Sequence, residues 1–518
     1  MAETDKLDYT LGGQVLPADV HNTTLIKHVH PPDWANPMPA GRYNLVVIGG
    51  GTAGLVTAAG AAGLGAKVAL VERHLMGGDC LNVGCVPSKA VIRAARAAFD
   101  VTDARRFGVV VPDGVHVDFA AAMERMRGIR AHISHHDSFQ RFRDLGVDVF
   151  LGNALFTGPE TVEVAGKTLR FAKAVICSGA RTLEPEIPGL KEAGFLSNEN
   201  VFNLTELPPR MACIGGGPIG CELAQAFHRL GAQVTLFHNG AHLLNKEDAD
   251  AAAIIQQAFV REGIELVLSA CVERVESVGK GAGRAKVLYY STPAGPRQVE
   301  VDAILVGAGR APNVEGMGLE KMGIQFDKRK GIVVNDRLQT TNPKIYAAGD
   351  CCMDWKFTHA ADFAARTVLQ NALFMGKKQL SSLTMPWCTY TDPEIAHVGL
   401  YQHEAQTRGI AIDTYTRPFS EVDRALADGE EEGLVKIHVA KGSDKILGAT
   451  IVARHAGEML GELTLAIKHG IGLGSIAAVI HPYPTQAEAI RQLGDQINRG
   501  KLTPLVKTLF AKWLAWQR

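Results

Sequence analysis

The chain has 518 residues, with 54 Lys or Arg and 54 Asp or Glu, so its formal net charge is zero. This balance gives no electrostatic reason to expect a nucleic-acid-binding protein, and at roughly 150 residues per domain the length predicts about three domains. The sequence has no apolar run long enough to cross a membrane, and its acidic start, Met1–Asp5, is unlike a signal peptide. Its nine cysteines are an odd number and lie mostly in apolar runs, so we expect a reducing compartment, the cytoplasm.

The first 42 residues are polar and rich in proline, which predicts a wrapped arm or a disordered leader. Their three histidines, His21, His28 and His30, could suggest a metal site. Because lone histidines usually lie at protein surfaces, we favour a surface position over a metal-binding role.

A nucleotide-binding pattern follows the leader. Tyr43–Ile48 predicts a buried strand, the segment GGGTAG at 49–54 opens an Ala-rich helix, and a second strand at 67–71 ends in Glu72. Gly49, Gly51 and Gly54 suit a tight turn and a close approach of the backbone to a pyrophosphate, and the acid suits a ribose hydroxyl. Strand, loop, helix, strand and acid occur in order, which predicts a dinucleotide site.

Two cysteines five positions apart, Cys80 and Cys85, lie in the segment GGDCLNVGCVPSK at 77–89, where we expect a helix to begin. They can form a disulfide only if their Cα atoms lie within about 7 Å of each other, and a helix N-terminus favours the thiolate. A structural disulfide and a zinc site are the alternatives, but no second Cys or His pair has the usual metal-site spacing. The segment predicts a redox pair, with one sulfur exposed and the other behind it.

This segment resembles the active-site disulfide of the pyridine nucleotide-disulfide oxidoreductases, the class I flavoprotein disulfide reductases. They include dihydrolipoamide dehydrogenase, glutathione reductase and mercuric reductase. The resemblance implies that Cys80 is the interchange thiol that meets the substrate, that the Cys85 thiolate lies against the flavin, and that Lys89 lies near the flavin's reactive edge. It also implies that the first nucleotide site, together with Gly78, binds FAD.

Residues 91–143 have a helical pattern that includes His132, His135, His136 and Asp137. His132 and His136 would share one helix face. That spacing can bind a metal, but without a further ligand pair we favour a solvated or packed face. Short strands are predicted at 147–151, 161–164 and 174–177, and a domain boundary near Pro188.

The nucleotide-binding pattern then recurs. A strand at 211–214 leads into Gly215, Gly217 and Gly220, then a helix, and then a strand at 233–237. In a flavoprotein, a second dinucleotide site is most simply that of NAD(P)H, and the resemblance pairs Glu222 on this helix with Lys89 across the flavin. The strand ends in His238 where an acid would select NAD. No arginine lies beside it to bind the 2′-phosphate of NADPH. However, an acid at this position would repel that phosphate, and His238 does not, so we favour NADPH.

Two later segments resemble family signatures. Gly309 and Arg310 close the second nucleotide domain, and Asp350 is implied to hold the ribityl and pyrophosphate region of FAD. The vicinal Cys351 and Cys352 could supply extra ligands for a soft metal. We favour buried small residues, because a free cysteine behaves as a small hydrophobe.

From Pro386 the chain resembles the interface domain of the family, in which a homodimer completes the active site. Dithiol reductases place a histidine two residues before the Thr of the closing motif, held by a Glu, to shuttle a proton. Here the motif is HPYPTQAE at 481–488, so Tyr483 takes that place and Glu488 is the acid. A phenol with a pKa near 10 is a poor base, although it can donate a hydrogen bond or face a metal. His481 would need a different side-chain direction to substitute for the missing histidine.

Mercuric reductases also carry tyrosine at this position, but they end in a cysteine pair, and this chain has no cysteine after Cys388. We therefore expect a mercuric reductase-like enzyme without assigning Hg(II) as its substrate.

The last stretch, 501–518, predicts an amphipathic helix with Thr503 as N-cap and Pro504 as its first residue. Its apolar residues share one broad side and all its charges are positive. Such a helix could lie on an anionic membrane surface. We favour packing against the protein's own dimer, because amphipathic helices usually face a core.

The sequence thus predicts an α/β fold with two doubly wound, Rossmann-like domains and an α+β dimerisation domain. The expected parts are an N-terminal arm (1–42), an FAD-binding domain (43–190 and 310–385), an NAD(P)-binding domain (191–309), an interface domain (386–500) and the amphipathic helix (501–518).

The expected activity is FAD-dependent oxidation of NAD(P)H, in which the dithiol of Cys80 and Cys85 transiently holds and reduces a soft metal ion or its thiol complex. The alternatives are reduction of a small disulfide, as in dihydrolipoamide dehydrogenase or glutathione reductase, and a membrane-docked redox sensor or electron-transfer subunit.

Overall fold

The computed structural model describes residues 15–279 and 285–518, so the acidic start, Met1–Asp5, lies outside the described residues. The chain divides into two compact units. The first comprises the described residues up to Asn239 together with 270–383, and the second comprises 240–269 together with 384–518. The finer domain boundaries expected from the sequence stay a prediction.

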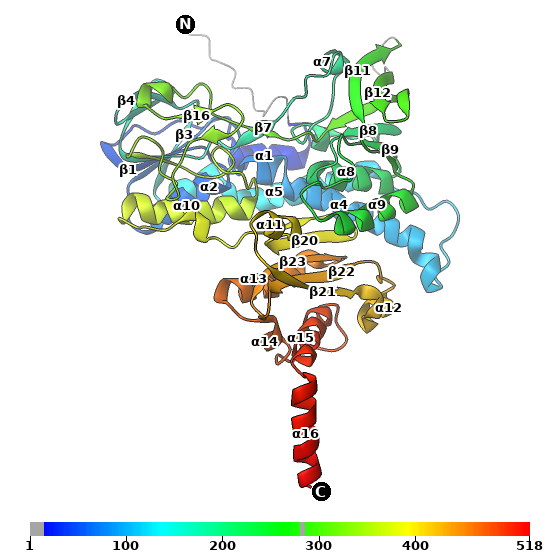
Figure 1. The fold of residues 1–518 in the computed structure, drawn as a ribbon. Helices are drawn as coiled ribbons and strands as arrows, with labels where there is room; N and C mark the ends of the chain where they lie inside the picture. The colour runs from blue at the N-terminus through cyan, green and yellow to red at the C-terminus, as the bar shows by residue number, and fades with distance from the viewer. Residues whose placement is uncertain (1–14, 280–284) are drawn as a thin grey trace. The chain divides into compact units, whose positions relative to one another are not determined.

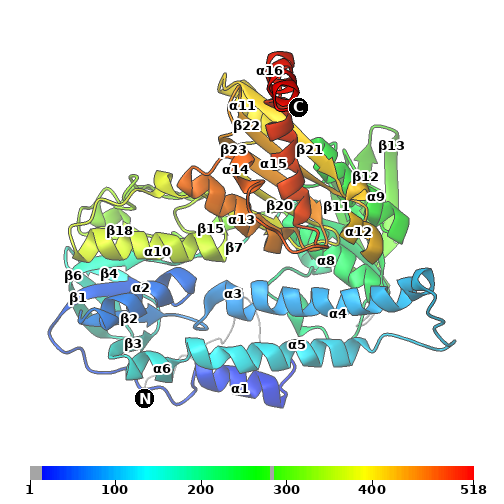
Figure 2. The same ribbon diagram turned by 90° about the horizontal axis from the view of Figure 1, so that it is seen from below.

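The largest sheet of the first unit has the strand order β3-β2-β1-β6-β5-β4, with β18 also paired to β6. Its strands are β1 (Arg42–Ile48), β2 (Val68–Glu72), β3 (Val147–Leu151), β4 (Leu155–Gly158), β5 (Thr161–Val164), β6 (Lys167–Ile176) and β18 (Ile345–Ala347). Strand β1 pairs in parallel with β2 and β6, and its apolar run is almost wholly buried, as parallel sheets covered on both faces require. Helices α2 (Thr52–Gly63) and α10 (Thr358–Leu373) lie side by side (Figures 1 and 2).

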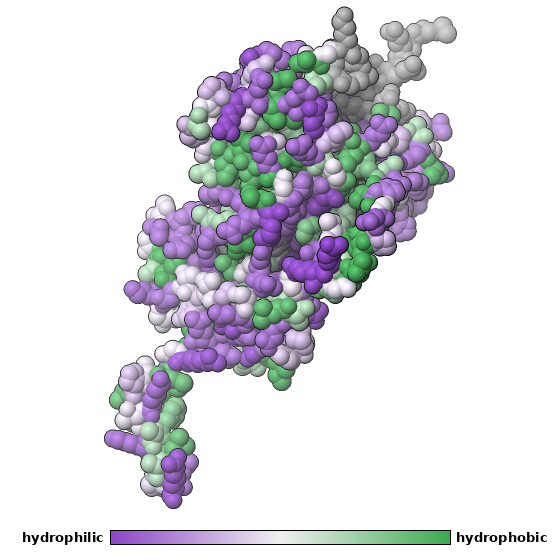
Figure 3. Space-filling view, turned by 90° about the vertical axis from the view of Figure 1, so that its right-hand side faces the viewer, coloured by the Kyte–Doolittle hydropathy of each residue, from purple (hydrophilic) through white to green (hydrophobic). Residues whose placement is uncertain are grey.

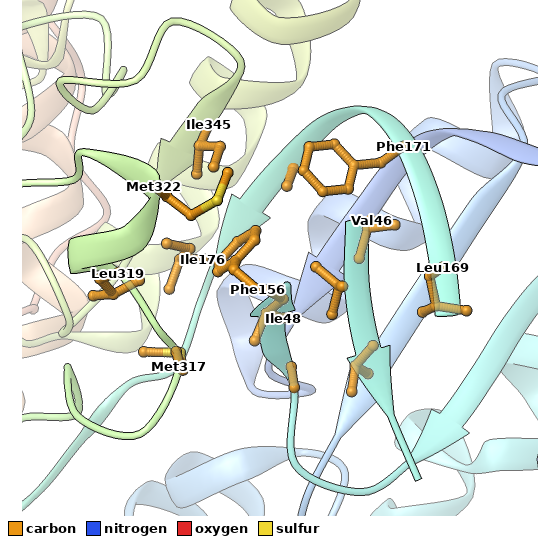
Figure 4. Packing of buried hydrophobic residues seen from close by; sticks show 14 of the residues in the cluster. Val46, Ile48, Phe156, Leu169, Phe171, Ile176, Met317, Leu319, Met322 and Ile345 are labelled. Carbon is orange, nitrogen blue, oxygen red and sulfur yellow. The ribbon is translucent and has the colours of Figure 1, made fainter. Parts of the chain in front are cut away.

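The core of this sheet joins segments that are far apart in the sequence. Figure 4 shows Val46 and Ile48 of β1 near Phe156 and Ile176, with Met317, Leu319, Met322 and Ile345 packed into the same cluster. The rings of Phe156 and Phe171 meet edge to face, with centroids 6.1 Å apart. The chain after residue 310 therefore returns to the first sheet.

A second parallel sheet in the same unit has the order β9-β8-β14. Its strands are β8 (Arg210–Ile214), β9 (Gln233–Phe237) and β14 (Ala303–Val306), and helix α8 (Pro218–Arg229) follows β8. An antiparallel sheet of β11 (Cys271–Val278), β12 (Ala285–Thr292) and β13 (Gly295–Val301) accompanies it. The predicted pair of nucleotide-binding folds is present.

The second unit contains a five-stranded antiparallel sheet in the order β19-β20-β23-β22-β21. Its strands are β19 (Pro386–Thr389), β20 (Glu394–Gly399), β21 (Ile412–Pro418), β22 (Leu434–Ala440) and β23 (Ile446–Ala453). Helices α13 (Ala456–His469) and α15 (Glu488–Gly500) pack on it through a shared apolar core, and α16 (Pro504–Trp516) follows. The predicted α/β class with an α+β portion is confirmed.

The helical stretch predicted at 91–143 is partly wrong. The structure has α4 (Cys85–Asp103), α5 (Phe119–Ile133) and α6 (Phe139–Asp144), with short 3₁₀ turns at 104–107 and 134–137. Residues 108–118 are not helical, because they combine Pro112, several valines and two glycines, Gly108 and Gly114, with positive φ.

The described part of the leader contains a helix, α1 (Val20–Val29), capped by the Asp19 side chain. It packs against α5, as Figure 2 shows, and α5 packs in turn against α4. The leader is therefore part of the first unit's helical layer.

Candidate active site

The redox cysteines lie on two successive helices of the first unit. Cys80 is in the short helix α3 (Gly78–Asn82), and Cys85 is the first residue of α4. The N-cap of α4 is Gly84, which makes no side-chain capping bond, so the first-turn N–H groups and the helix dipole act on Cys85. Cys80 is half-buried and Cys85 is exposed.

The two thiols have opposite pKa shifts. A hydrogen bond between the sulfurs lowers the pKa of Cys85 to about 6, with further lowering from the Thr358 hydroxyl and the Lys89 ammonium. The Thr358 oxygen lies 3.4 Å from the Cys85 sulfur. The same sulfur–sulfur bond, together with burial, raises the pKa of Cys80. Cys85 is therefore the thiolate at neutral pH, which supports the role that the resemblance implies for this residue. Cys80, expected to meet the substrate, is the less exposed of the two, and its role stays a prediction.

An ion pair links the redox helix to the second nucleotide fold. Lys89 lies one turn after Cys85, and its Nζ is 2.8 Å from Oε2 of Glu222, a buried residue of α8. Helices α4 and α8 pack against each other, which brings these two predicted residues together.

The first nucleotide site fits a dinucleotide. The buried Glu72 carboxylate accepts hydrogen bonds from the backbone N–H of Gly50 (2.5 Å) and of His74 (2.7 Å), and burial raises its pKa. A side chain at Gly78 would place its Cβ 2.7 Å from the Cα of Gly51. Gly51 caps α2 without a side chain, so the first N–H groups of α2 suit a pyrophosphate. Gly49 and Gly54 lie in the same turn, as predicted.

Arg310, Asp79 and Asp350 form a charged cluster near α3. The guanidinium of Arg310 pairs with Asp79, and its Nε is 3.4 Å from Asp350 Oδ2. Burial raises the pKa of Asp350. Gly309 precedes this arginine with a φ of 118°, so the predicted residues of the two family signatures, 309–310 and 350, meet here.

The second nucleotide site repeats the first with one change. The backbone N–H of Gly216 donates to Nδ1 of the buried His238 at 3.3 Å, where Gly50 donates to Glu72 in the first site. Because Nδ1 accepts this bond, the neutral ring carries its proton on Nε2 and can donate to an oxygen. Gly215 has a positive φ, a Cβ at Gly220 would clash with the Gly215 carbonyl, and Gly217 caps α8.

The leader and α5 contact the chain on both sides of Cys80, at Met76 and at Asn82. The sequence did not predict these contacts. Arg130 of α5, 2% exposed, donates to the Asn82 carbonyl at the end of α3 and to Asn22 of α1, both at 2.7 Å. The Met76 N–H donates to the Val29 carbonyl at 3.0 Å. The only local signal was Asp19, an ordinary helix N-cap.

We expect Arg130→Met to lower the free energy of unfolding by about 2 to 3 kcal/mol, because it removes charge-assisted bonds from two buried acceptors. Urea denaturation of the FAD-loaded enzyme measures this loss. Arg125→Met, at an exposed position of the same helix, is the matched control. Equal stability of the two variants would contradict a bracing role for Arg130.

The closing motif lies in the second unit. Tyr483 is 69% exposed, and its hydroxyl donates to Oδ2 of Asp423 at 2.9 Å; this bond raises the pKa of the phenol. Glu488 instead accepts from Arg491 at 2.7 Å, and His481 Nε2 lies 2.9 Å from Glu462. The acid bound to the phenol is thus Asp423, to which the sequence reasoning gave no role, and not Glu488.

Other candidate ligands have packing or surface roles. His132, His135 and His136 are exposed, and helix α5 ends before His136, so His132 and His136 do not share one α-helical face. Cys351 is fully buried and Cys352 half-buried against the core of the first sheet. Among residues 15–279 and 285–518, no group of three His, Cys, Asp or Glu side chains could hold a metal.

The leader histidines have local partners. His28 lies 2.8 Å from the Ser134 hydroxyl, His30 bonds the His74 carbonyl, and His21 lies 3.9 Å from Glu124. Within the part of the chain that the structure describes, no helix is both long and apolar enough to cross a bilayer.

Comparison with known families agrees with this arrangement. Residues 43–365 match the family model described as pyridine nucleotide-disulphide oxidoreductase, and residues 385–493 match the dimerisation domain of the same family. The chain belongs to the pyridine nucleotide-disulphide oxidoreductases. It is an FAD-dependent enzyme that uses NAD(P)H, and the second match supports a homodimer.

The curated relatives described here have two named activities. The chain is 33% identical to the mercuric reductase of Staphylococcus aureus over 451 residues, which cover 87% of this chain and 82% of that protein. It is also 33% identical to the dihydrolipoyl dehydrogenase of Thermus scotoductus over 469 residues, 88% of this chain and 98% of that one.

Among solved structures, the HOCl-induced flavoprotein disulfide reductase RclA of Escherichia coli is similar, with a TM-score of 0.78 and 28% identity. The match covers 88% of this chain and 99% of RclA. A Cu(II) complex of RclA gives a TM-score of 0.76.

Proposed function

We propose that this enzyme reduces a soft metal ion, or its thiol complex, with electrons from NAD(P)H. The proposal depends most on Tyr483, which stands where dithiol reductases of the family place a proton-shuttling histidine. Its phenol is bound to a carboxylate that raises its pKa, so it is a poor proton acceptor at neutral pH. Reduction of a disulfide requires a proton for the leaving thiol, whereas reduction of a bound cation does not.

The redox cysteines would deliver electrons to the metal ion and bind it, and the Lys89–Glu222 pair would support the flavin. When bound, FAD accepts the hydride of NAD(P)H and passes the electron pair to the cysteine disulfide. Cys85, with its low pKa, and the half-buried Cys80 would then offer two soft sulfur ligands to a cation. The Lys89–Glu222 pair would position the nicotinamide side of the flavin.

The redox balance is simple for a divalent ion. NAD(P)H supplies two electrons and releases NAD(P)⁺ and a proton, while Hg(II) is reduced to Hg(0), or two Cu(II) ions are each reduced to Cu(I). The similarity to a mercuric reductase and to a protein solved with Cu(II) supports these ions as the first to test.

The test is NAD(P)H oxidation by one enzyme preparation with Hg(II), Cu(II), gold ions, lipoamide and glutathione disulfide. We expect turnover with a soft ion and little with either disulfide. Turnover confined to a disulfide would support the second candidate, reduction of a small disulfide, which the similarity to dihydrolipoyl dehydrogenase favours.

We also infer a preference for NADPH. His238 presents a hydrogen-bond donor where Glu72 presents an acceptor in the first site, and a donor suits a 2′-phosphate while a carboxylate repels it. We expect His238→Glu to lower the ratio of kcat/KM for NADPH to that for NADH by about tenfold or more, the effect of one charge-assisted hydrogen bond.

Steady-state kinetics with both cofactors measures this ratio. Gln233→Glu adds the same charge at the exposed start of the same strand and is the matched control. A ratio that both variants change equally would show that His238 does not contact the nucleotide.

We propose a cytoplasmic location, which the odd number of cysteines and their apolar surroundings favour; Cys177, Cys213, Cys221 and Cys351 are buried thiols. A peripheral contact of this cytoplasmic enzyme with the inner membrane surface would be made by α16.

A further inference from the structure

Helix α16 is the feature that the catalytic function leaves unexplained. It lies beyond the residues matched by the dimerisation-domain model, which end at 493. Thr503 caps it by accepting from the Val506 N–H, and Pro504 is its first residue, so the helix has its own start signal. The helix is therefore a regular element with its own N-cap, and it lies outside the part of the chain that matches the family.

The helix has an apolar side that the chain leaves uncovered. At 100° per residue, its large apolar side chains occupy about half of the circumference. They are Leu505 (71% exposed), Val506, Leu509, Phe510, Trp513 (56%), Leu514 and Trp516 (77%). No residue of α16 is buried among the described residues, and Figure 3 shows hydrophobic residues on its surface beside hydrophilic ones.

The positive charges of residues 501–518 indicate an anionic partner for α16. Residues 501–518 contain Lys501, Lys507, Lys512 and Arg518 but no acidic residue, although the whole chain is electrically balanced. At the same 100° per residue, Lys507 and Lys512 flank the two edges of the apolar side, and Arg518 follows the end of the helix. Trp513 and Trp516 pair, with ring centroids 5.2 Å apart, and tryptophan prefers the level of lipid headgroups.

We propose that α16 docks this enzyme on the surface of an anionic phospholipid bilayer. Its 13 residues span about 20 Å at 1.5 Å per residue, which is less than the roughly 30 Å of a bilayer's hydrocarbon core. The helix therefore lies along the interface, with its apolar side among the acyl chains and the ammonium groups of its flanking lysines toward the headgroups. This inference does not depend on which substrate the enzyme reduces.

The test is flotation of the full-length, FAD-loaded enzyme with vesicles of equal parts phosphatidylcholine and phosphatidylglycerol. We expect the native enzyme to float with these vesicles, and less at high salt, because salt screens exposed charges. Deletion of residues 501–518 is expected to abolish flotation while NAD(P)H oxidation by the purified enzyme continues.

Point variants separate charge from apolar burial. Lys507→Gln/Lys512→Gln is expected to lower the partition coefficient about 25-fold, or fivefold for each lysine. Trp513→Ala/Trp516→Ala is expected to lower it by more than tenfold. Lys441→Gln/Lys445→Gln removes the same charge from an exposed turn of the second unit and should leave flotation unchanged.

Three results would overturn the proposal. They are the absence of flotation, equal flotation with pure phosphatidylcholine vesicles, and a deletion that changes the oligomer mass in light scattering without affecting vesicle binding. The last result would assign α16 to a contact between copies of this chain.

Discussion

Two-electron reduction of the FAD-loaded enzyme is expected to produce a long-wavelength absorption band that Cys85→Ser abolishes. Such a band requires a thiolate in contact with oxidised flavin, and Cys85 is the cysteine of the redox pair whose pKa is lowered, by the Cys80 thiol, the Thr358 hydroxyl and Lys89. Cys80→Ser should show the band without reduction, because it leaves Cys85 unable to form a disulfide. Anaerobic titration followed by absorption spectroscopy measures both variants.

The pH dependence of this band follows from the lowered pKa. A thiolate exists above its pKa, so the band should be full at neutral pH and fade as the pH falls through about 6. Loss of the Lys89 charge in Lys89→Met should move this fading to higher pH. Cys271→Ser, at an exposed cysteine on β11, is the matched control and should match the native enzyme. Identical spectra of Cys80→Ser and Cys85→Ser would show that the assignment of roles is wrong.

The second large effect concerns Tyr483. If its phenol serves as a donor or metal-facing oxygen, Tyr483→Phe should slow metal-dependent turnover and leave flavin reduction by NAD(P)H intact. General acid–base assistance is typically worth about 10²- to 10⁴-fold. Tyr483→His should therefore raise the weak activity of the native enzyme toward lipoamide or glutathione disulfide by a factor in that range.

The Tyr483→His experiment also needs a variant of Asp423, the carboxylate that binds the Tyr483 hydroxyl. It accepts the Tyr483 hydrogen bond at 2.9 Å, while Glu488 is held by Arg491, so we expect Asp423 to be the carboxylate that orients the introduced histidine. Adding Asp423→Asn to Tyr483→His should remove much of the gain. Tyr415→Phe, which removes a hydroxyl elsewhere in the same unit, is the control. Native turnover of a disulfide at about 10 per second or more, the ordinary enzyme range, would contradict the metal proposal.

Several elements could be predicted from the sequence because their signals are contiguous. The strands at 147–151, 161–164 and 233–237 have the bounds expected of them, and the strands preceding both glycine loops differ from expectation by only one residue. Alternation, apolar runs and glycine turns act over a few residues, so they are readable without a structure. The redox segment was readable for the same reason, since both cysteines lie within one short helix-start pattern.

The same local reasoning failed between 108 and 118, where Pro112 and two left-handed glycines interrupt a stretch that looks helical over longer windows. The helix α1 was also missed, because the leader is rich in proline overall, although Pro17 and the prolines from Pro31 onward all lie outside the helix.

The electrostatics of the site were decided only by the tertiary structure. Thr358 reaches Cys85 from 273 positions away, Arg310 reaches Asp79 from 231, and Lys89 meets Glu222 from 133. Such contacts depend on which helices pack against each other and at which turn they meet. Local sequence propensities do not determine this packing. The sequence by itself therefore determined the two nucleotide folds, the redox pair and the tyrosine in place of a base. Only the packing of α3, α4 and α10 decided which thiol is ionised, and only the packing of α4 against α8 brought Glu222 to Lys89.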